Sequence, residues 1–348
     1  MTFSISLSRQ SRRVFQGRIR FLSLALLGLT GAMGLGLSSC GGGDTSGSST
    51  DMPFVAVSQF VEHPSLDAVQ EGLKDELGEA GYTDGENLRW ELESAQSNPA
   101  TATQIAQKYA GASPSVIVAI ATPSAQSAVS EAGNVPVIFS AVTDPLAAGL
   151  VDTVEKPGGL VSGVSDLSPV KDHLDLMKEV LPEAKTIGVI YSAGEDNSVS
   201  LVKLVKENAE ASGFDQVQEA TVASSSEVAT AARSLIGSVD AIYVPTDNTV
   251  VSAFESVVQV GQENDVPVFS GDTDSVERGA IASLGFNYYD IGTQTGEMVV
   301  KVLKGTKPGD LPVEFANILR LHVNPAAAES MGVTLPESVL ERADETVQ

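Results

Sequence analysis

Short unbroken apolar runs alternate along this chain with longer segments in which apolar residues recur at helical spacing. In one stretch, the run Val116 to Ala121 is followed by Thr122-Pro123-Ser124, a helix-like segment ending near Gly133, and a second run from Val135 to Phe139. Apolar runs too short for a helix core, separated by about a dozen helix-forming residues, are typical of a parallel sheet covered on both faces. The stretch therefore predicts a strand, a helix and a strand.

The same alternation continues on both sides of this stretch. The further strands it predicts are Phe54 to Phe60, Leu88 to Leu92, Leu160 to Val164, Thr186 to Tyr191, Val217 to Val222, Ala241 to Val244, Val266 to Phe269 and Ala280 to Phe286. The further helices it predicts are Leu66 to Gly81, Ala100 to Ala110, Pro169 to Leu181, a helix that runs to Ala211, Ser226 to Ile236, Val250 to Glu263, Ile291 to Leu303 and a short helix after Pro336. The pattern predicts an α/β protein.

Two segments of the chain are near copies of each other. Asn134-Val-Pro-Val-Ile-Phe-Ser and Asp265-Val-Pro-Val-Phe-Ser are each followed within a few residues by Thr-Asp. This indicates two similar Rossmann-like lobes with parallel sheets, joined by crossover hinge strands. We expect residues 53–163 and 278–311 in the first lobe, and residues 164–277 and 312–348 in the second.

The N-terminal segment has the layout of a signal peptide. Five arginines, from Arg9 to Arg20, precede the apolar stretch Phe21 to Leu37, and no acidic residue occurs before Asp44. A spanning helix is the alternative, but the stretch is barely long enough for one and is interrupted by four glycines. We therefore predict that residues 1–39 are an export signal, and Arg12-Arg13 leaves open the twin-arginine route.

Cys40 follows this segment in the sequence Leu37-Ser38-Ser39-Cys40 and precedes a stretch rich in glycine, serine and threonine. The sequence resembles the lipobox of bacterial lipoproteins, in which the signal is cut before the cysteine and that cysteine carries the lipid. Cys40 is the only cysteine in the chain, so no disulfide is expected. A chance buried thiol is the alternative to a lipid-bearing Cys40 followed by a flexible linker over residues 40–52.

The charge of the chain limits its partners. The 348 residues carry a net charge of −24, and removal of the arginine-rich signal makes the mature chain more acidic still. Such a surface disfavours nucleic acid and anionic lipid as partners. The three histidines, His63, His173 and His322, are dispersed, so neither a metal nor another cofactor is expected.

Polar residues collect where the predicted strands end. Ligands of open α/β sheets bind outside the carboxyl ends of the strands, so we expect a site there for a ligand that carries both charges. Hydroxyls and helix N-termini fit a carboxylate, and an aspartate fits an ammonium group. The candidate residues are Gln59, Phe60, Glu62, Thr122, Ser124, Asp144, Glu195, Asn197, Ser198, Asp247, Asn248 and Asp272.

Each candidate also has a structural alternative. Thr122, Ser124, Asn197 and the pair Asp247-Asn248 stand where helices begin and are suited to capping them. Asp144 and Asp272 are suited to turns. Phe60 is suited to stacking on an apolar ligand or to packing in a core. His63, before Pro64, is more typical of a structural or surface residue than of a catalytic one.

As a set, several motifs resemble a known family. They are Glu62-His63-Pro64-Ser65-Leu66-Asp67, Ala121-Thr122-Pro123-Ser124-Ala125-Gln126, Val142-Thr143-Asp144-Pro145, Asn197-Ser198, Val244-Pro245-Thr246-Asp247-Asn248 and Val323-Asn324-Pro325-Ala326 with Met331-Gly332-Val333. The chain from about Phe54 to Ala343 resembles the tryptophan/tyrosine-type solute-binding proteins of bacterial ABC importers, which have a type I periplasmic-binding fold.

The resemblance implies a function without catalysis. It implies an exported, lipid-tethered and monomeric receptor that closes around an amino acid, aromatic or branched-chain, and hands it to an ABC permease with its ATPase. It also implies that Thr122, Ser124, Asn197 and Ser198 contact the ligand carboxylate and that Asp247 binds the ammonium group.

Two rival functions remain open from the sequence. The segment Ser270-Gly271-Asp272-Thr273-Asp274 resembles the aspartyl nucleophile of haloacid dehalogenase-like phosphatases, although that motif belongs on the first strand of that family. A lipid-anchored sensor subunit that binds the same solute is the second rival.

Overall fold

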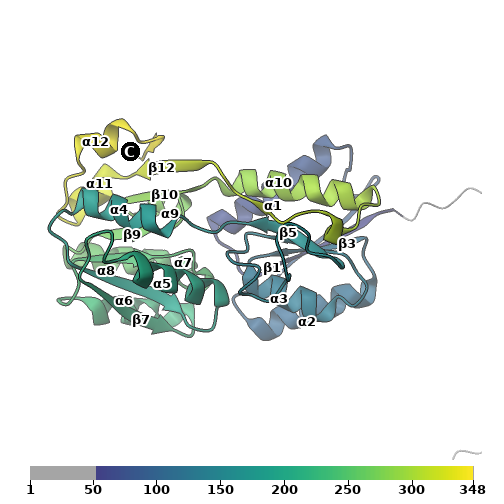
Figure 1. Ribbon diagram of the computed structural model, residues 1–348, viewed down its shortest axis with the longest axis horizontal. Helices are drawn as coiled ribbons and strands as arrows, with labels where there is room; N and C mark the ends of the chain where they lie inside the picture. Colours follow the sequence, from purple (N-terminus) through teal and green to yellow (C-terminus); the bar gives the residue numbers. More distant parts are fainter. Residues whose placement is uncertain (1–51, 348) are drawn as a thin grey trace, which may run out of the picture. The chain divides into compact units, whose positions relative to one another are not determined.

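The computed structural model describes residues 52–347 of the chain (Figure 1). The predicted signal peptide over residues 1–39 and the predicted lipidation site at Cys40 lie outside these residues. Within residues 52–347, none of the helices combines the length and the apolar character needed to cross a bilayer.

The first lobe is built on a six-stranded, all-parallel sheet with the strand order β11-β5-β4-β3-β1-β2. The helices α1 and α10 cover one face of this sheet, and α2 and α3 cover the other (Figure 1). The bounds are β1 (Phe54–Gln59), α1 (Pro64–Glu79), β2 (Arg89–Ser94), α2 (Pro99–Ala112), β3 (Val116–Ile120), α3 (Thr122–Glu131), β4 (Val137–Ser140), β5 (Val161–Ser165), α10 (Tyr288–Leu303), the 3₁₀ helix η2 (Pro308–Asp310) and β11 (Glu314–Phe315).

The second lobe is built on a four-stranded parallel sheet with the order β7-β6-β8-β9. A smaller sheet, β10-β12-β13, adjoins it. The bounds are α4 (Val170–Val180), β6 (Thr186–Ser192), α5 (Asp196–Asn208), β7 (Gln216–Val222), the 3₁₀ helix η1 (Ser225–Glu227), α6 (Val228–Leu235), β8 (Ala241–Val244), α7 (Asn248–Val251), α8 (Phe254–Glu263), β9 (Val268–Ser270), α9 (Asp274–Glu277), β10 (Ala282–Phe286), β12 (Leu319–Val323), α11 (Pro325–Ser330), α12 (Glu337–Glu341) and β13 (Glu345–Thr346).

The predicted α/β class with two parallel-sheet lobes is confirmed. The central strands β1, β3 and β4 are buried along their whole length, as expected for strands covered on both faces. The helix predicted over Val250 to Glu263 is instead two helices, α7 and α8, because the backbone leaves helical geometry at Ala253 (φ −127°, ψ 29°). Apolar spacing alone did not reveal this break.

The chain passes between the two hydrophobic cores three times. Val164 packs in the first core and Val170 in the second, Ala282 packs in the second and Phe286 in the first, and Val313 and Leu321 mark the third passage. The expected lobe boundary near residue 278 falls before the second passage, because β10 pairs antiparallel with β12 and its first residues belong to the second core. The third passage likewise follows residue 311. These passages are the crossover hinges.

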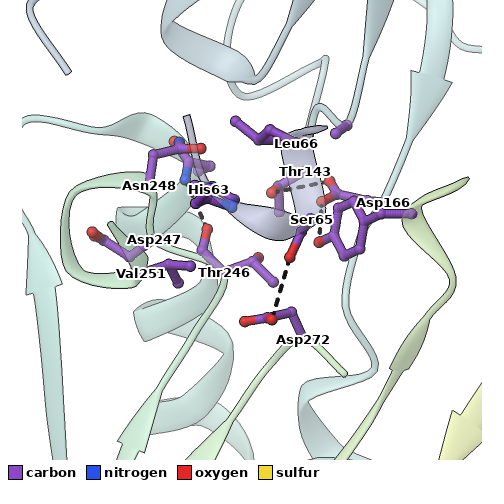
Figure 2. A pocket seen from close by; sticks show the side chains of 13 residues that line it. His63, Ser65, Leu66, Thr143, Asp166, Thr246, Asp247, Asn248, Val251 and Asp272 are labelled. Atoms are coloured by element: carbon purple, nitrogen blue, oxygen red, sulfur yellow. Dashed lines mark hydrogen bonds between the residues drawn. The ribbon is translucent and has the colours of Figure 1, made fainter. Parts of the chain in front are cut away.

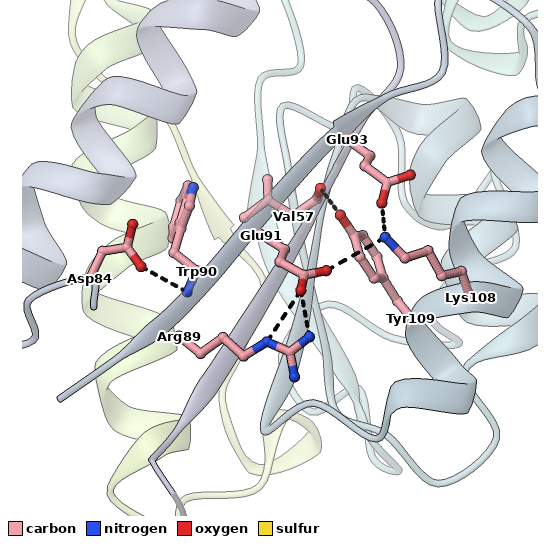
Figure 3. A network of polar contacts seen from close by, with 8 residues as sticks. All are labelled: Val57, Asp84, Arg89, Trp90, Glu91, Glu93, Lys108 and Tyr109. Atoms are coloured by element: carbon pink, nitrogen blue, oxygen red, sulfur yellow. Dashed lines mark hydrogen bonds and ion pairs between the residues drawn. The ribbon is translucent and has the colours of Figure 1, made fainter. Parts of the chain in front are cut away.

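The edge strand β2 of the first sheet is covered with charge (Figure 3). Arg89 pairs with Glu91, and Lys108 on α2 pairs with Glu93 and, at 3.6 Å, with Glu91. An exposed edge strand offers unpaired backbone groups to other chains, and charged side chains oppose such pairing. This network therefore keeps the edge of the sheet from associating.

Candidate functional site

A cavity lies between the two lobes and beside two of the hinge passages (Figure 2). Its lining residues are His63, Ser65, Leu66, Ala141, Thr143, Asp166, Asn197, Thr246, Asp247, Asn248, Val251, Asp272 and Tyr288. The volume that the centre of a water-sized sphere can reach is about 20 Å³, which is room for one water molecule. A larger solute therefore enters only when the lobes separate.

The first lobe presents the beginning of α1 to this cavity. Pro64 starts the helix, and its fixed φ and missing N–H suit the first helical position. The backbone N–H groups of Ser65 and Leu66 have no acceptor among residues 52–347, and the next N–H, that of Asp67, bonds to the His63 carbonyl. The first turn of α1 therefore brings two free donors to the cavity.

His63 stands immediately before α1 and is buried. Burial, followed by the charge of Arg278, lowers the pKa of His63 to about 3, so its imidazole is neutral. The Asn248 side chain of the second lobe acts on this pKa in the opposite direction and raises it, and Nδ1 has no hydrogen-bond partner among residues 52–347. The sequence favoured a structural or surface role for His63, whereas the structure places it in the cavity wall.

The second lobe presents Asp247, at the end of β8, to the same cavity. Its Oδ2 accepts a hydrogen bond of 2.5 Å from the Ser192 N–H, and its Oδ1 accepts one of 2.7 Å from the Val250 N–H. Burial, and then the nearby Glu195 carboxylate, raise the pKa of Asp247 to about 7. Asp247 therefore caps α7 and also faces the cavity, so the two interpretations of this residue do not exclude each other.

Glu195 is buried beside Asp247 but does not line the cavity. Its Oε2 accepts hydrogen bonds from the backbone and side-chain amides of Asn248, and its Oε1 accepts from the backbone N–H and the hydroxyl of Thr249. These four donors come from the beginning of α7. Glu195 therefore fixes the position of Asn248 in the cavity wall.

Two further polar groups in the second-lobe wall have no hydrogen-bond partner among residues 52–347. Asn197 Nδ2 donates to the Thr246 carbonyl (3.1 Å) and to Ser198 Oγ (3.3 Å), which leaves Asn197 Oδ1 as a buried acceptor without a donor. Thr246 Oγ1 is also buried without a partner. Buried polar atoms are almost always hydrogen-bonded, so these atoms, with His63 Nδ1, make the cavity a candidate site for a polar ligand or an ordered water molecule.

Asp166 lies at the first hinge passage, directly after β5. Its Oδ2 accepts a 2.9 Å hydrogen bond from the Tyr288 hydroxyl, and its Oδ1 accepts one of 3.4 Å from Thr143 Oγ1. Burial raises the pKa of Asp166. Tyr288 is the first residue of α10 and follows the second passage closely, so this cluster joins the first hinge segment to the end of the second at the cavity.

Asp272 links the two lobes. It accepts hydrogen bonds from the backbone N–H and the hydroxyl of Ser275 in its own lobe (2.8 and 2.9 Å), and one from Ser65 Oγ in the other lobe (3.3 Å; Figure 2). Burial raises the pKa of Asp272. Its contacts are those of a turn and capping residue that also reaches across the cavity.

Among the described residues, the lining contains three carboxylates and no lysine or arginine. The carboxylates are those of Asp166, Asp247 and Asp272. Buried charges are normally paired, so the cavity suits a ligand with a cationic group. Within residues 52–347, no three His, Cys, Asp or Glu side chains are grouped to hold a metal ion.

The structure brings four of the twelve candidate residues into the lining: Asn197, Asp247, Asn248 and Asp272. The other eight are Gln59, Phe60, Glu62, Thr122, Ser124, Asp144, Glu195 and Ser198. Asp144 accepts hydrogen bonds from the N–H groups of Leu146 and Ala147, as a turn residue does. Gln59 donates to Asp67 at 2.7 Å and so supports the loop before α1.

The remaining candidates have contacts elsewhere in the two lobes. Ser124 Oγ accepts from Ser58 Oγ at 3.5 Å, and the buried Thr122 Oγ1 has no hydrogen-bond partner in the described part of the chain. Phe60 packs in the first core and lines a separate hollow. Glu62 accepts from Gln96.

Several lining residues were not among the candidates. They are His63, Ser65, Leu66, Ala141, Thr143, Asp166, Thr246, Val251 and Tyr288. Asp166 directly follows a predicted strand, and Thr246 directly precedes Asp247, so the position after a strand was a usable signal for both. Tyr288 comes to the cavity only through the hinge passage, which the sequence pattern does not locate to single residues.

Comparison with known proteins gives concordant matches. A family model described as ABC transporter substrate binding protein matches residues 54–347. A protein named tyrosine-binding protein, from Clostridioides difficile (strain R20291), is 38% identical over 313 residues, which are 88% of this chain and 90% of that protein.

Two similar solved structures differ in their ligand state. The structure of an ABC domain in complex with L-Trp, from Streptococcus pneumonia, is 38% identical and has a TM-score of 0.82, covering 85% of this chain and 99% of its own. A ligand-free, open substrate binding protein from Clostridium difficile is 40% identical and has a TM-score of 0.64 over the same shares of the two chains. At nearly equal identity, the chain is closer in shape to the complex.

Proposed function

The chain belongs to the ABC transporter substrate binding protein family, and from that premise we propose that it captures an amino acid, aromatic or branched-chain, between its lobes and delivers it to an ABC importer. The tyrosine named in one relative and the L-Trp bound to another support an aromatic ligand. Such a receptor acts with a permease and its ATPase as partners and requires no cofactor.

One observation carries this proposal. The cavity is lined from both lobes by groups that match the two charges of a zwitterion and its apolar side chain. Free N–H donors at α1 suit the carboxylate, and the acceptor-rich second-lobe wall suits the ammonium group. Leu66, Val251 and Tyr288 offer apolar surface between them.

We assign the ammonium group to Asp247 and Asn197. Asp247 keeps lone pairs beyond the two that hold backbone N–H groups, and Asn197 Oδ1 is a buried acceptor without a donor. An ammonium group at this position would pair a buried carboxylate and satisfy the amide oxygen. It would also offset the repulsion between Asp247 and Glu195.

Binding proceeds by hinge closure in this account. The lobes meet through contacts such as Ser65 with Asp272, and the three passages are the segments that bend. A ligand that touches both lobes stabilises the closed state by contacts that the open state lacks. The closer likeness to the L-Trp complex than to the open structure supports this reading.

We further propose that the protein is exported, is anchored at the membrane by a lipid on Cys40 and acts as a monomer. The support is the arginine-rich, apolar N-terminal segment that ends at the only cysteine. A receptor on a lipid tether stays near the permease that it serves.

The proposed ligand class is tested by a thermal-shift screen of the mature protein against amino acids, nucleosides and sugars. A ligand that binds only the folded state raises the melting temperature. We expect aromatic or branched-chain amino acids to do so and nucleosides and sugars not to. A rise with sugars alone would contradict the proposed function.

A further inference from the structure

We propose that Asp274 takes up a proton from solvent when the two lobes close, so that capture of the ligand is coupled to proton uptake. This inference rests on the proposed function, because it adds a regulation to the hinge closure described there. Asp274 is the first residue of α9 and does not line the cavity. The proton is therefore held beside the binding site, where the lobes meet.

Two carboxylates stand close together at this position. Asp272 and Asp274 are two residues apart in the segment that leads into α9. Asp272 accepts hydrogen bonds from the backbone N–H and the hydroxyl of Ser275 and from Ser65 Oγ in the other lobe (Figure 2). Hydrogen bonds of this kind favour the charged form of a carboxyl group. Asp272 is therefore the better supported of the two negative charges.

Asp274 has less support for a charge. The residue is half-buried, and its Oδ2 is a buried atom with no hydrogen-bond partner among residues 52–347. The Ser65 hydroxyl is nearby, but it has a single proton, which it donates to Asp272 at 3.3 Å. A charged Asp274 would therefore place a second negative charge beside Asp272 with one oxygen that no donor reaches. A proton on Asp274 removes that repulsion.

The neighbours of Asp274 within the second lobe do not neutralise it. Asp272 and Glu277 are acidic, and Arg278 is the basic residue that acts on Asp274. The Arg278 guanidinium is already held by Glu255, through Nε at 2.7 Å and Nη2 at 2.9 Å. The attraction of Arg278 for Asp274 is therefore shared with another carboxylate.

The first lobe brings further acidic and neutral groups to this place. Burial, followed by Asp166, raises the pKa of Tyr288 well above its usual value, and Asp272 and Asp274 add to that rise. The Tyr288 phenol is therefore neutral, and its hydroxyl donates to Asp166 at 2.9 Å. Its one proton is thus not available to Asp274.

Closure of the lobes is what sets these conditions. Ser65 and α1 lie against this segment only while the lobes are together, and an exposed aspartate titrates near 3.9. In the closed structure burial, followed by Asp272, raises the pKa of Asp274 to about 6, although Ser65 and Arg278 lower it. Because the pKa is higher in the closed state, protonation favours closure. This contribution is complete below about pH 4 and is lost as the pH rises through about 6.

The test replaces the carboxyl group by a neutral side chain of the same shape. Calorimetry with L-tryptophan and L-tyrosine at pH 5.0 and pH 7.5 gives the Kd for the wild type, Asp274→Asn and Asp274→Ala. Asp172→Asn, an exposed aspartate in the first turn of α4, is the matched control. At pH 5.0, titrations in two buffers with different heats of ionisation give the number of protons taken up. Melting curves without ligand show which variants are folded.

Two differences from the wild type are expected. At pH 5.0 the wild type should take up about half a proton or more in excess of Asp274→Asn. The difference is informative because His63, whose pKa burial lowers, releases a proton on closure in both proteins. At pH 7.5 Asp274→Asn should bind about tenfold more tightly than the wild type, because it has no charge to bury.

The direction of the second change separates coupling from a structural role. Loss of a merely structural aspartate weakens binding, whereas loss of a buried charge strengthens it. Asp274→Ala should change the Kd in the same direction as Asp274→Asn, so it carries the test if the asparagine variant fails to fold. Asp172→Asn should match the wild type in both measurements.

Two results would overturn the inference in different ways. A wild type that binds an amino acid, beside an Asp274→Asn that takes up as many protons or binds no more tightly at pH 7.5, contradicts the coupling alone. A wild type that binds neither amino acid contradicts the proposed function, and the coupling that rests on it is then wrong as well.

Discussion

Ser65 Oγ, in the first turn of α1, donates a hydrogen bond of 3.3 Å to Asp272 Oδ1, which belongs to the loop before α9 in the other lobe. Both residues are buried, and both line the cavity. The contact exists only while the lobes are together. Closure of the lobes and recognition of the ligand therefore use the same side chains, which couples the two events.

Removing the Asp247 carboxylate tests the ammonium partner. We expect Asp247→Ala to weaken amino acid binding by about 1.5 to 3 kcal/mol, the value of a charged hydrogen bond, which is a tenfold to hundredfold rise in Kd. Calorimetry measures this change. Asp310→Ala, at an exposed site in η2, is the control. An unchanged Kd for every amino acid that binds would remove Asp247 from the site.

A contact between the lobes outside the cavity allows the effect of closure to be measured apart from ligand recognition. Gln126 Nε2 on α3 donates to Asp196 Oδ2 on α5 at 2.6 Å, outside the cavity lining. We predict that Gln126→Ala raises the Kd about twofold to fivefold because it weakens only the closed state. The rise should be equal for an amino acid such as L-tryptophan and for tryptamine, the amine that lacks its carboxylate. Gln218→Ala, whose contacts lie within one lobe, should have no effect. A loss confined to one ligand class would disprove this role.

The buried, neutral His63 predicts a pH dependence of binding. Its pKa is lowered to about 3 in the closed state, whereas an exposed histidine titrates near 6.5. Protonation therefore favours the open state: the contribution of His63 to closure is complete above pH 6.5 and declines as the pH falls below that value.

The size of this effect is measured against a variant. Asp166, Asp247 and Asp272 line the same cavity and also titrate, and Arg278 is nearby, so the informative quantity is the difference between the wild type and His63→Gln. Between pH 7.5 and pH 5.5 we expect the wild-type Kd to rise about tenfold more than that of His63→Gln. Parallel pH profiles would refute the role of His63.

Two glycines of α1 form a matched pair for the fold. A Cβ on Gly72 would lie 2.2 Å from the Tyr289 carbonyl oxygen of α10, while a Cβ on Gly78 would meet nothing within 4 Å. We predict that Gly72→Ala lowers the free energy of unfolding by about 1 to 3 kcal/mol through overpacking. Gly78→Ala should raise it by about 0.5 to 1 kcal/mol. Equal effects in denaturant titrations would show that α1 and α10 do not pack as closely as described.

The predicted lipid anchor depends on one residue. We expect Cys40→Ala to remove the acyl group and to move the protein from the membrane fraction to the soluble fraction, since no other cysteine is present to replace it. Mass spectrometry of the mature N-terminus and cell fractionation measure the two effects. A variant that remains with the membrane would contradict anchoring at Cys40.

The fold was largely predictable because buried parallel strands appear in the sequence as short apolar runs. Ala241 to Val244 was predicted as a strand and is β8. The copies around Pro136 and Pro267 lead into β4 and β9, and each of these strands pairs in parallel with the strand that precedes it in the sequence. The passages between lobes were located less well. The predicted strand begins with the buried apolar residues Ala280 to Ala282, which would suit the core of either lobe, and only the pairing of β10 with β12 assigns them to the second lobe.

The site was predictable only as a region. Strand-end position selected Asn197, Asp247 and Asp272, which line the cavity, but it selected Glu195 and Asp144 as well, which do not. Both Asp247 and Glu195 accept from backbone N–H groups, so this contact does not separate the two sets. Local sequence does not distinguish a capping carboxylate from a binding one. His63 was interpreted from its place before Pro64 as a structural or surface residue, whereas its place in the cavity wall follows from packing against the other lobe.

The central claim is that the cavity between the lobes binds a zwitterionic amino acid. Calorimetric titration of the mature protein with L-tyrosine and L-tryptophan, beside their N-acetyl derivatives, tests it most directly. We predict saturable one-to-one binding of an amino acid and no binding of its N-acetyl form, because acetylation removes the positive charge that Asp247 pairs. Equal binding of both forms, or binding of neither, would contradict the account.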